Sequence, residues 1–260
     1  MTSDSNSPRS AIESARRTIA IERQAVEQLE HRIDDSFSKA VDLLASVDGR
    51  VIVSGMGKSG HIGNKIAATL ASTGTPAQFV HPAEACHGDM GMVTRSDAAL
   101  LMSNSGTTSE ITALLPLLKR LGIPIIAMTG NASSTLASAA DVHLNIGVSE
   151  EACPLDLAPT ASTTANLVMG DALAIALLEQ RGFTAEDFAF THPGGALGRR
   201  LLTRVSDVLV TGNDVPRVTT DTSLADALME ISAKGLGMST VIDGNGHLPV
   251  SYTHLTLPTK

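Results

Sequence analysis

A glycine-rich turn supplies the first residues that could bind an anion. The segment Gly55-Met-Gly57-Lys58-Ser59-Gly60 follows the apolar residues 51–54 and precedes apolar residues at helical spacing. A turn that leads into a helix N-terminus exposes backbone N–H groups, and Lys58 adds a positive charge beside them. The segment therefore predicts a site for an anionic group such as phosphate. The alternative is a tight turn between strand and helix in which Lys58 is solvated.

Two nucleotide-binding motifs share glycines with this turn, but the sequence excludes both. A P-loop requires a glycine at the position where this chain has Ile52. A dinucleotide-binding fold requires an acidic residue at the end of the next strand, about 20 residues further on, to bind the ribose. Residues 77–81 read Ala-Gln-Phe-Val-His instead. We therefore expect no NAD site and no other cofactor.

A second polar segment, Ser103-Asn-Ser-Gly-Thr-Thr-Ser-Glu110, follows the apolar residues 98–102. Its closely spaced hydroxyls, at the start of a helical pattern, could surround a phosphate without any net positive charge. Thr107 and Glu110 also fit a capping box, S/T-x-x-E, which requires no ligand. Because one cap needs one hydroxyl, we favour a ligand-binding loop, in which Glu110 serves either the ligand or the cap.

Acidic and imidazole side chains occur in two further segments. Glu84 and His87 are three residues apart, so a helical turn would place them on one face. Neither H-E-x-x-H nor C-x-x-C spacing is present, and we therefore expect no catalytic metal. Residues 149–164 contain Glu150 and Glu151 and end in a cluster of hydroxyls that leads into a long helical pattern.

The elements that would position these residues alternate regularly along the chain. Short apolar runs predict buried strands, and apolar residues at helical spacing follow them. This alternation predicts parallel strands with helices on both faces, which is a three-layer, doubly wound α/β sandwich with its site at the carboxyl ends of the strands. The predicted strands are residues 51–54, 98–102, 123–128 and 142–146, and the predicted helices are residues 62–70, 111–121, 133–140 and 163–181.

We place this α/β domain at residues 10–202. The pattern of apolar residues in the regions at its two ends differs from the alternation within it. Residues 1–9 are predicted to be disordered, and residues 10–47 to form one or two amphipathic helices of the kind that often supplies an oligomer interface. Residues 203–248 predict a small β-α-β unit of an incomplete α+β domain. Residues 249–260 resemble translated sequencing-adaptor read-through, so we expect a non-native tail with neither the strand nor the helix that would complete the unit. The alternating pattern at residues 251–257 could form a strand by chance.

Composition excludes several classes of function. Lys and Arg number 19 against 27 Asp and Glu, giving a net charge of -8, and aromatic residues make up 2% of the chain. With no basic block, nucleic acid is not an expected partner. No apolar run reaches the roughly 18 residues that span a bilayer, so no membrane is expected. Two distant cysteines and no leader segment predict a cytoplasmic protein.

Five segments together resemble the sugar isomerase (SIS) domain of bacterial arabinose 5-phosphate isomerases. The resemblance extends over residues 12–247. In that family two CBS motifs follow the SIS domain, and residues 205–247 resemble only the beginning of the first. The matching segments are GMGKSGHIG (55–63), STGTPAQFVHPAEACHGDMGMV (72–93), SNSGTTSEI (103–111), EACPLDLAPTASTTANLVMGDALA (151–174) and FTHPGGALGRRLL (190–202).

The resemblance implies isomerisation of D-ribulose 5-phosphate to D-arabinose 5-phosphate, which supplies Kdo for lipopolysaccharide. In one respect the chain departs from the family: the loop that commonly reads Ser-Asn-Ser-Gly-Glu-Ser has Thr107 and Thr108 at its last two positions, so one carboxylate is lost. The catalytic candidates are Lys58, Glu110, Glu151 and His192, and the substrate-binding candidates are Gly57, Ser59, His87, Ser103, Ser105, Thr108 and Thr163.

The expected mechanism follows from moving a carbonyl between C1 and C2. A base must take a carbon-bound proton, and a donor must stabilise the enediolate oxygen. We expect Glu151 to be the base, with Glu110 as the alternative, and Lys58 to stabilise the oxyanion. His192 would move protons between oxygens, and His87 would assist.

The resemblance also bears on assembly and on rival functions. Similar SIS domains complete their sites across subunits with a histidine such as His192, so we expect a homo-tetramer. An isomerase of another phosphosugar is one alternative. A non-catalytic sensor of the SIS fold is another, although the first 47 residues show no basic recognition helix.

Overall fold

The computed structural model describes residues 10–253, which form two compact units divided between residues 201 and 202. The first unit contains a five-stranded sheet with strand order β2-β1-β3-β4-β5, and every neighbouring pair is parallel. The chain therefore runs outward from β1 in both directions, which confirms the predicted doubly wound sheet. The strands are β1 (Val51–Gly55), β2 (Ala77–Phe79), β3 (Ala98–Met102), β4 (Ile125–Thr129) and β5 (Val142–Asn145).

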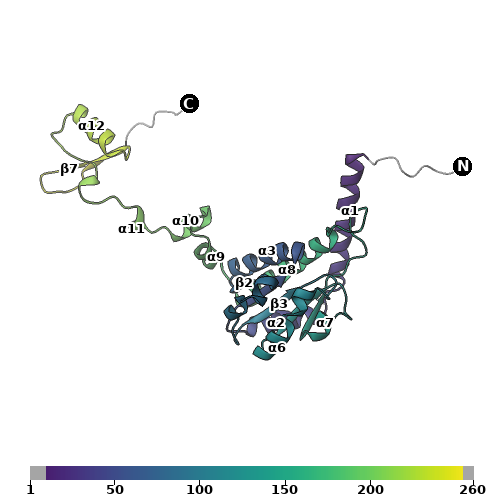
Figure 1. The fold of residues 1–260 in the computed structure, drawn as a ribbon. Helices are drawn as coiled ribbons and strands as arrows, with labels where there is room; N and C mark the ends of the chain where they lie inside the picture. The colour runs from purple at the N-terminus through teal and green to yellow at the C-terminus, as the bar shows by residue number, and fades with distance from the viewer. Residues whose placement is uncertain (1–9, 254–260) are drawn as a thin grey trace. The chain divides into compact units, whose positions relative to one another are not determined.

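Helices cover both faces of this sheet, because successive strand residues point to opposite sides. Val51 and Val53 of β1 belong to one hydrophobic core, whereas Ile52 belongs to the other. In Figure 1, α3 and α8 lie on one side of the sheet, and α6 and α7 lie on the other. The first core is covered by α1 (Ala11–Glu30), α2 (Asp35–Ser46), α3 (Gly57–Ser72) and α8 (Ala161–Arg181), and the second by α4 (Pro82–Cys86), α5 (Ser109–Thr112), α6 (Leu115–Leu121) and α7 (Thr135–Ala139).

The closest packing in the first core joins α3 to α8. Gly170 of α8 faces Ile66 of α3, which is completely buried. A Cβ atom on Gly170 would lie 2.3 Å from Cδ1 of Ile66, so only glycine allows this approach. Within residues 10–253, α8 is the one helix long and apolar enough to span a membrane by composition, and half of its most apolar window is buried in this core.

Several element boundaries differ from the sequence prediction for local reasons. The segment predicted as one helix at residues 111–121 forms two, α5 and α6, because Pro116 lies in the first turn of α6 and cannot continue a helix from before it. The N-terminal flank forms two helices, as one of the two predicted alternatives had it, since the Asp34 side chain accepts a hydrogen bond from the N–H of Ser36 and begins α2. Strand β2 was missed because it is three half-buried residues at the sheet edge.

The second unit contains the predicted β-α-β element and one strand more. Strands β6 and β7 pair in parallel, and β7 pairs antiparallel with β8. The expectation that no strand follows residue 248 is wrong, because residues 250–253 take the ladder position beside β7 that the alternating pattern allowed. The remaining expectations, for residues 1–9 and 254–260, lie outside the described residues. The unit's elements are α11 (Val205–Val208), η2 (Gly212–Asp214), β6 (Arg217–Thr219), α12 (Leu224–Lys234), β7 (Met238–Ile242) and β8 (Val250–Thr253).

The contact between Gly170 and Ile66 makes a prediction about stability. Gly170→Ala gains about 1 kcal/mol of helix propensity but overpacks a core contact, which costs about 1–3 kcal/mol. Since Ile66 has no exposed surface into which to move, we expect a net loss of about 1–2 kcal/mol in the free energy of unfolding. Urea denaturation measures this change in the free energy of unfolding. Gly91→Ala is the control, because its Cβ would enter open space; equal effects of the two substitutions would contradict the proposed packing role.

Candidate active site

The turn after β1 places the first turn of α3 at the carboxyl edge of the sheet. Gly57 adopts φ +57, and a Cβ on Gly60 would lie 2.6 Å from the carbonyl oxygen of Gly55. These two glycines therefore allow the helix to begin directly after the strand. Met56 occupies the N-cap position and, among the described residues, no side chain caps this helix end. The exposed Lys58 and the half-buried Ser59 lie in this first turn.

The loop after β3 is shaped by its own hydroxyl groups. The buried Ser103 Oγ accepts a hydrogen bond from the N–H of Gly106 at 3.0 Å and lies 2.8 Å from Oγ1 of Thr108. The hydroxyl of Thr107 donates to Ser105 Oγ at 3.1 Å. The capping-box alternative is thereby wrong: the hydroxyl of Thr107 is used within the loop, and Thr108 is the N-cap of α5. Ser105 and Thr107 are exposed at the loop surface.

Glu110 lies in α5 and accepts a hydrogen bond from the hydroxyl of Ser109 at 2.7 Å. This bond, together with the Glu110 backbone N–H, lowers the pKa of the Glu110 carboxyl. Glu110 is therefore ionised at neutral pH.

Glu151 binds the N-terminus of α8. Its Oε2 accepts hydrogen bonds from the N–H of Thr160 at 2.7 Å, from the hydroxyl of Thr160 at 2.9 Å and from the N–H of Ser162 at 3.3 Å. Burial alone would raise the pKa of Glu151, but the hydrogen bonds from Ser162 and Thr160 outweigh it and lower the pKa. The partial positive charge of a 21-residue helix N-terminus acts in the same direction. The carboxylate is thus ionised and held in place.

Neighbouring residues fix the loop that carries Glu151. Oδ1 of Asp156 accepts the N–H of Glu151 at 3.2 Å, and Oγ1 of Thr160 accepts the N–H of Ala152 at 2.8 Å. Asp156 has φ +51, a backbone conformation that is rare for a residue other than glycine. The hydroxyl of Thr163 donates to the carbonyl of Thr160 at 2.8 Å. Thr163 therefore supports the start of α8.

A polar cavity of about 320 Å³ brings the loops after β1, β3 and β5 together. Loops at the carboxyl ends of β1 and β3 border the point where the strand order reverses, which is where doubly wound sheets bind ligands. Of the predicted site residues, Ser59 and Glu151 line this cavity. Four more are next to a lining residue in the chain and a fifth is two positions away: Lys58, Ser103, Ser105 and Thr163, and then Gly57. The lining residues are Ser59, Asn104, Val148, Ser149, Glu150, Glu151, Asp156, Leu157, Pro159 and Ser162.

The sequence analysis missed five polar residues of this lining as site candidates: Asn104, Ser149, Glu150, Asp156 and Ser162. Asn104 lies between two predicted hydroxyl residues, so its position in the loop was the available signal. Ser162 belongs to the hydroxyl cluster that the sequence showed, one residue before the predicted Thr163. Asp156 gave no signal, because its left-handed backbone and its bond to Glu151 exist only in the folded loop.

Four predicted residues, Thr108, Glu110, His87 and His192, lie more than two positions in the chain from any residue of the lining. Thr108 is the N-cap of α5. His87 is exposed at the end of α4, and Glu110 lies in α5. His192 ends α9 (Ala185–Thr191), which precedes α10 (Ala196–Leu202). The hydroxyl of Thr191 donates to the carbonyl of Ser72, at the last residue of α3, whereas Ser59 lies in its first turn. Ser59 and Ser72 are 13 positions apart, which at 1.5 Å per residue is about 20 Å along the helix, so His192 lies beside the end of α3 that is opposite to the cavity.

The His192 ring is nevertheless oriented. It stacks on Phe188 with ring centroids 4.1 Å apart, and Nδ1 lies 3.1 Å from the carbonyl oxygen of Phe188. Nδ1 also lies 2.9 Å from the hydroxyl of Thr191, so among the described residues both hydrogen-bond contacts of the ring use Nδ1, and Nε2 is the nitrogen left for a ligand.

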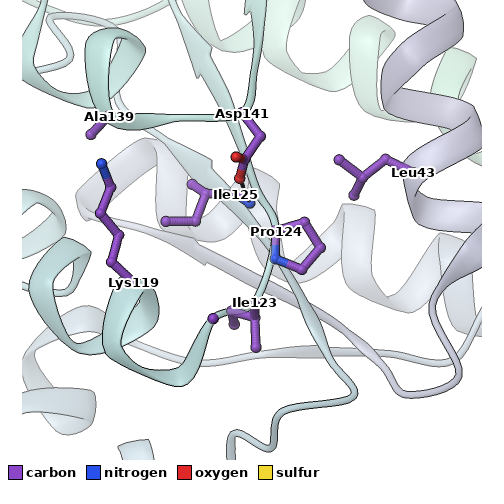
Figure 2. Close-up of a pocket in the computed structure, with 8 residues that line it drawn as sticks. Leu43, Lys119, Ile123, Pro124, Ile125, Ala139 and Asp141 are labelled. Atoms are coloured by element: carbon purple, nitrogen blue, oxygen red, sulfur yellow. Dashed lines mark hydrogen bonds between the residues drawn. The ribbon is translucent and has the colours of Figure 1, made fainter.

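A larger cavity, of about 590 Å³, lies at the opposite edge of the sheet (Figure 2). Pro124 and Asp141, in its lining, directly precede β4 and β5, so it faces the amino ends of these strands. Oδ2 of Asp141 accepts the N–H of Ile125 at 2.8 Å, which ties this carboxylate to the sheet. Because ligands of doubly wound sheets bind at the carboxyl ends, we do not place the active site here.

Neither cavity has a group of side chains, among the described residues, that could hold a metal ion. In the part of the chain from residue 10 to 253, no group of three or more His, Cys, Asp or Glu side chains could hold a metal ion.

Comparison with known proteins identifies similar chains. Residues 43–176 match the model of the SIS domain family. The chain is 64% identical over 242 residues to arabinose 5-phosphate isomerase KdsD of Pseudomonas aeruginosa, covering 93% of this chain and 74% of that protein. It is 58% identical over 233 residues to the KdsD of Escherichia coli K12, and the match covers 90% of this chain and 71% of that protein. A protein of E. coli CFT073 solved in complex with arabinose 5-phosphate is 46% identical, with a TM-score of 0.68 over 70% of this chain and 97% of its own.

The lowered pKa of Glu151 makes a prediction about stability and pH. A carboxyl whose pKa is lower in the folded state stabilises the protein above its unfolded pKa of about 4.3, and this contribution is lost as the pH falls through the folded value. We therefore expect Glu151→Gln to lower the urea midpoint at pH 7, and we expect its difference from the wild type to shrink as the pH falls below about 4.3.

The matched control is Glu150→Gln, the exposed neighbouring residue, which should leave the midpoint at pH 7 unchanged. A Glu151→Gln protein as stable as the wild type at pH 7 would show that the carboxylate does not cap α8.

Proposed function

The chain belongs to the arabinose 5-phosphate isomerases of the SIS domain family, and on that premise we propose that the cavity beside Glu151 interconverts D-ribulose 5-phosphate and D-arabinose 5-phosphate. The reaction is an aldose-ketose isomerisation. The observation that carries the proposal is an ionised carboxylate, fixed at a helix N-terminus, in a polar cavity that the first turn of α3 also lines.

Glu151 is the proposed base. At neutral pH it is ionised, as a base must be, and three donors hold its Oε2 so that the carboxylate cannot rotate freely. It takes the proton from C2 of the aldose or C1 of the ketose and returns it to the neighbouring carbon. The same donors reduce the basicity of Glu151, so the reaction also needs stabilisation of the enediolate. Glu110, in α5, is the alternative base.

The positive groups of the site have two tasks. Lys58 lies in the first turn of α3 and stabilises the oxygen on which negative charge develops. The uncapped N–H groups of that turn and the exposed hydroxyls of the loop at residues 103–108 bind the sugar phosphate. In a chain with a net charge of -8, such local groups must attract an anionic substrate.

His192 completes the site from a neighbouring subunit in this proposal. It lies beside the end of α3 opposite to the cavity of its own chain, about 20 Å along that helix from Ser59, and the hydrogen-bond contacts of its ring use Nδ1 and leave Nε2 for a ligand. The N-terminal helix offers an apolar face for assembly, with Ile12 and Ile19 each about two-thirds exposed. We therefore propose a homo-tetramer in which His192 moves protons between the enediol oxygens of an adjacent subunit.

The cellular setting follows from the family. We place the enzyme in the cytoplasm, where its product enters the synthesis of Kdo for lipopolysaccharide. The unpaired state of Cys86 and Cys153 agrees with a reducing compartment.

Turnover tests the proposed reaction. We expect NMR to show arabinose 5-phosphate forming from ribulose 5-phosphate with the wild-type protein. Glu151→Gln should lower kcat by about 100-fold or more, within the range for loss of a general base, and leave the binding of the sugar phosphate within about threefold. A folded wild type that binds ribulose 5-phosphate without converting it would favour the sensor alternative, and turnover of a different phosphosugar would favour another isomerase.

Mixed oligomers test the shared site. Glu151→Gln and His192→Asn, each inactive alone, should recover about a quarter of the wild-type activity when unfolded and refolded together, because about one site in four then combines both intact residues in a symmetric oligomer. Light scattering should give the mass of four chains. An active monomer, or mixed oligomers without activity, would contradict this assembly.

A further inference from the structure

Helix α1 makes polar contacts with the loop that carries Glu151. Nη2 of Arg17 donates to the carbonyl oxygen of Ala152 at 2.8 Å, and Nη1 of Arg32, just after the helix, donates to the carbonyl oxygen of Gly147. Oε2 of Glu22 accepts the hydroxyl of Thr164 at 3.1 Å. These contacts join residues separated by more than 100 positions, and all lie in the first unit. One helix therefore holds both the loop and the first turn of α8.

The loop at residues 146–160 depends on such contacts because it has little packing of its own. It contains no helix or strand, and most residues from 154 to 159 are exposed; Leu155 and Leu157 are 74% and 79% exposed. Structureless loops of this length are uncommon in compact domains and usually functional.

Arg17 binds the carbonyl group of Ala152, the residue that directly follows the proposed base Glu151. Ala152 is buried and directly follows Glu151. Its carbonyl accepts from Arg17, and its N–H donates to Oγ1 of Thr160, whose hydroxyl in turn donates to Oε2 of Glu151. A hydrogen bond from a charged donor is stronger than one between neutral groups. Arg17 therefore fixes one end of a chain of hydrogen bonds that ends on the carboxylate.

We propose that Arg17 is a positioning residue for the base Glu151, with Arg32 holding the start of the same loop and Glu22 holding the first turn of α8, which follows it. The proposal rests on the proposed isomerase function. It gives α1, which lies outside the residues that match the SIS family model, a task in the reaction itself. Small displacements of a reacting group can lower the rate about 100-fold, so fixing this loop matters to turnover.

The test replaces Arg17 by a side chain that keeps its apolar stem and cannot donate. Arg17→Met should lower kcat by about 10- to 100-fold, because the base is misplaced. KM should stay within about twofold, because the proposed phosphate-binding loop at residues 103–108 is held by its own hydrogen bonds. Arg17→Lys retains one charged donor and should recover a large part of kcat. Amide hydrogen exchange across residues 147–160 should become faster in Arg17→Met.

The matched control is Arg16→Met, an exposed arginine on the same helix, which should behave as the wild type in every measurement. Unchanged kcat in folded Arg17→Met, unchanged amide exchange, or no recovery in Arg17→Lys would each overturn the role of Arg17. If Arg17→Met does not fold, Arg32→Met makes the same test at Gly147, at the start of the loop. A wild type without turnover would instead contradict the proposed function. The amide exchange would then still show whether the hydrogen bond from Arg17 to Ala152 fixes the loop.

Discussion

The hydrogen bonds between Glu151 and the N-terminus of α8 are the interaction on which the site depends. A helix begins with N–H groups that lack partners within the helix, and here a carboxylate from the preceding loop supplies them with an acceptor. The same contact therefore caps the longest helix of the described chain and sets the position of the proposed base. Because the carboxylate remains ionised, a structural requirement and a catalytic one are met by a single group.

The packing of α8 on α3 sets the dimensions of the cavity. Gly170 brings the two helices into close contact at Ile66, and Ser59 and Ser162, near their N-terminal ends, line the same cavity. The partial positive charges of the N-termini of α3 and α8 therefore both face this cavity. At α8 the charge is balanced by Glu151, whereas at α3 it is left for a ligand. In the proposed site, this asymmetry leaves the N-terminus of α3 to attract an anionic sugar to a protein with a net charge of -8.

Other parts of the first unit hold the loops around the cavity through hydrogen bonds. Arg17 and Arg32 reach the loop from the N-terminal helix, and Ser103 shapes the neighbouring loop from within. His192 is held at the other end of α3, where its ring stacks on Phe188. A rigid helix thus separates two groups that the proposed reaction needs together, which is why one chain alone does not bring them into contact.

Local patterns in the sequence determined the sheet and the location of the site. Buried strands such as β1 and β3 are short apolar runs, and the polar segments that follow them must lie at one edge of a parallel sheet, so Ser59 and Glu151 could be predicted to share a cavity. Only the tertiary structure decided that Glu151 caps α8, that Asp156 supports it from a left-handed conformation and that Arg17 holds the adjacent peptide. The physical reason is that these bonds join residues up to 135 positions apart, and their geometry depends on packing that no local pattern records.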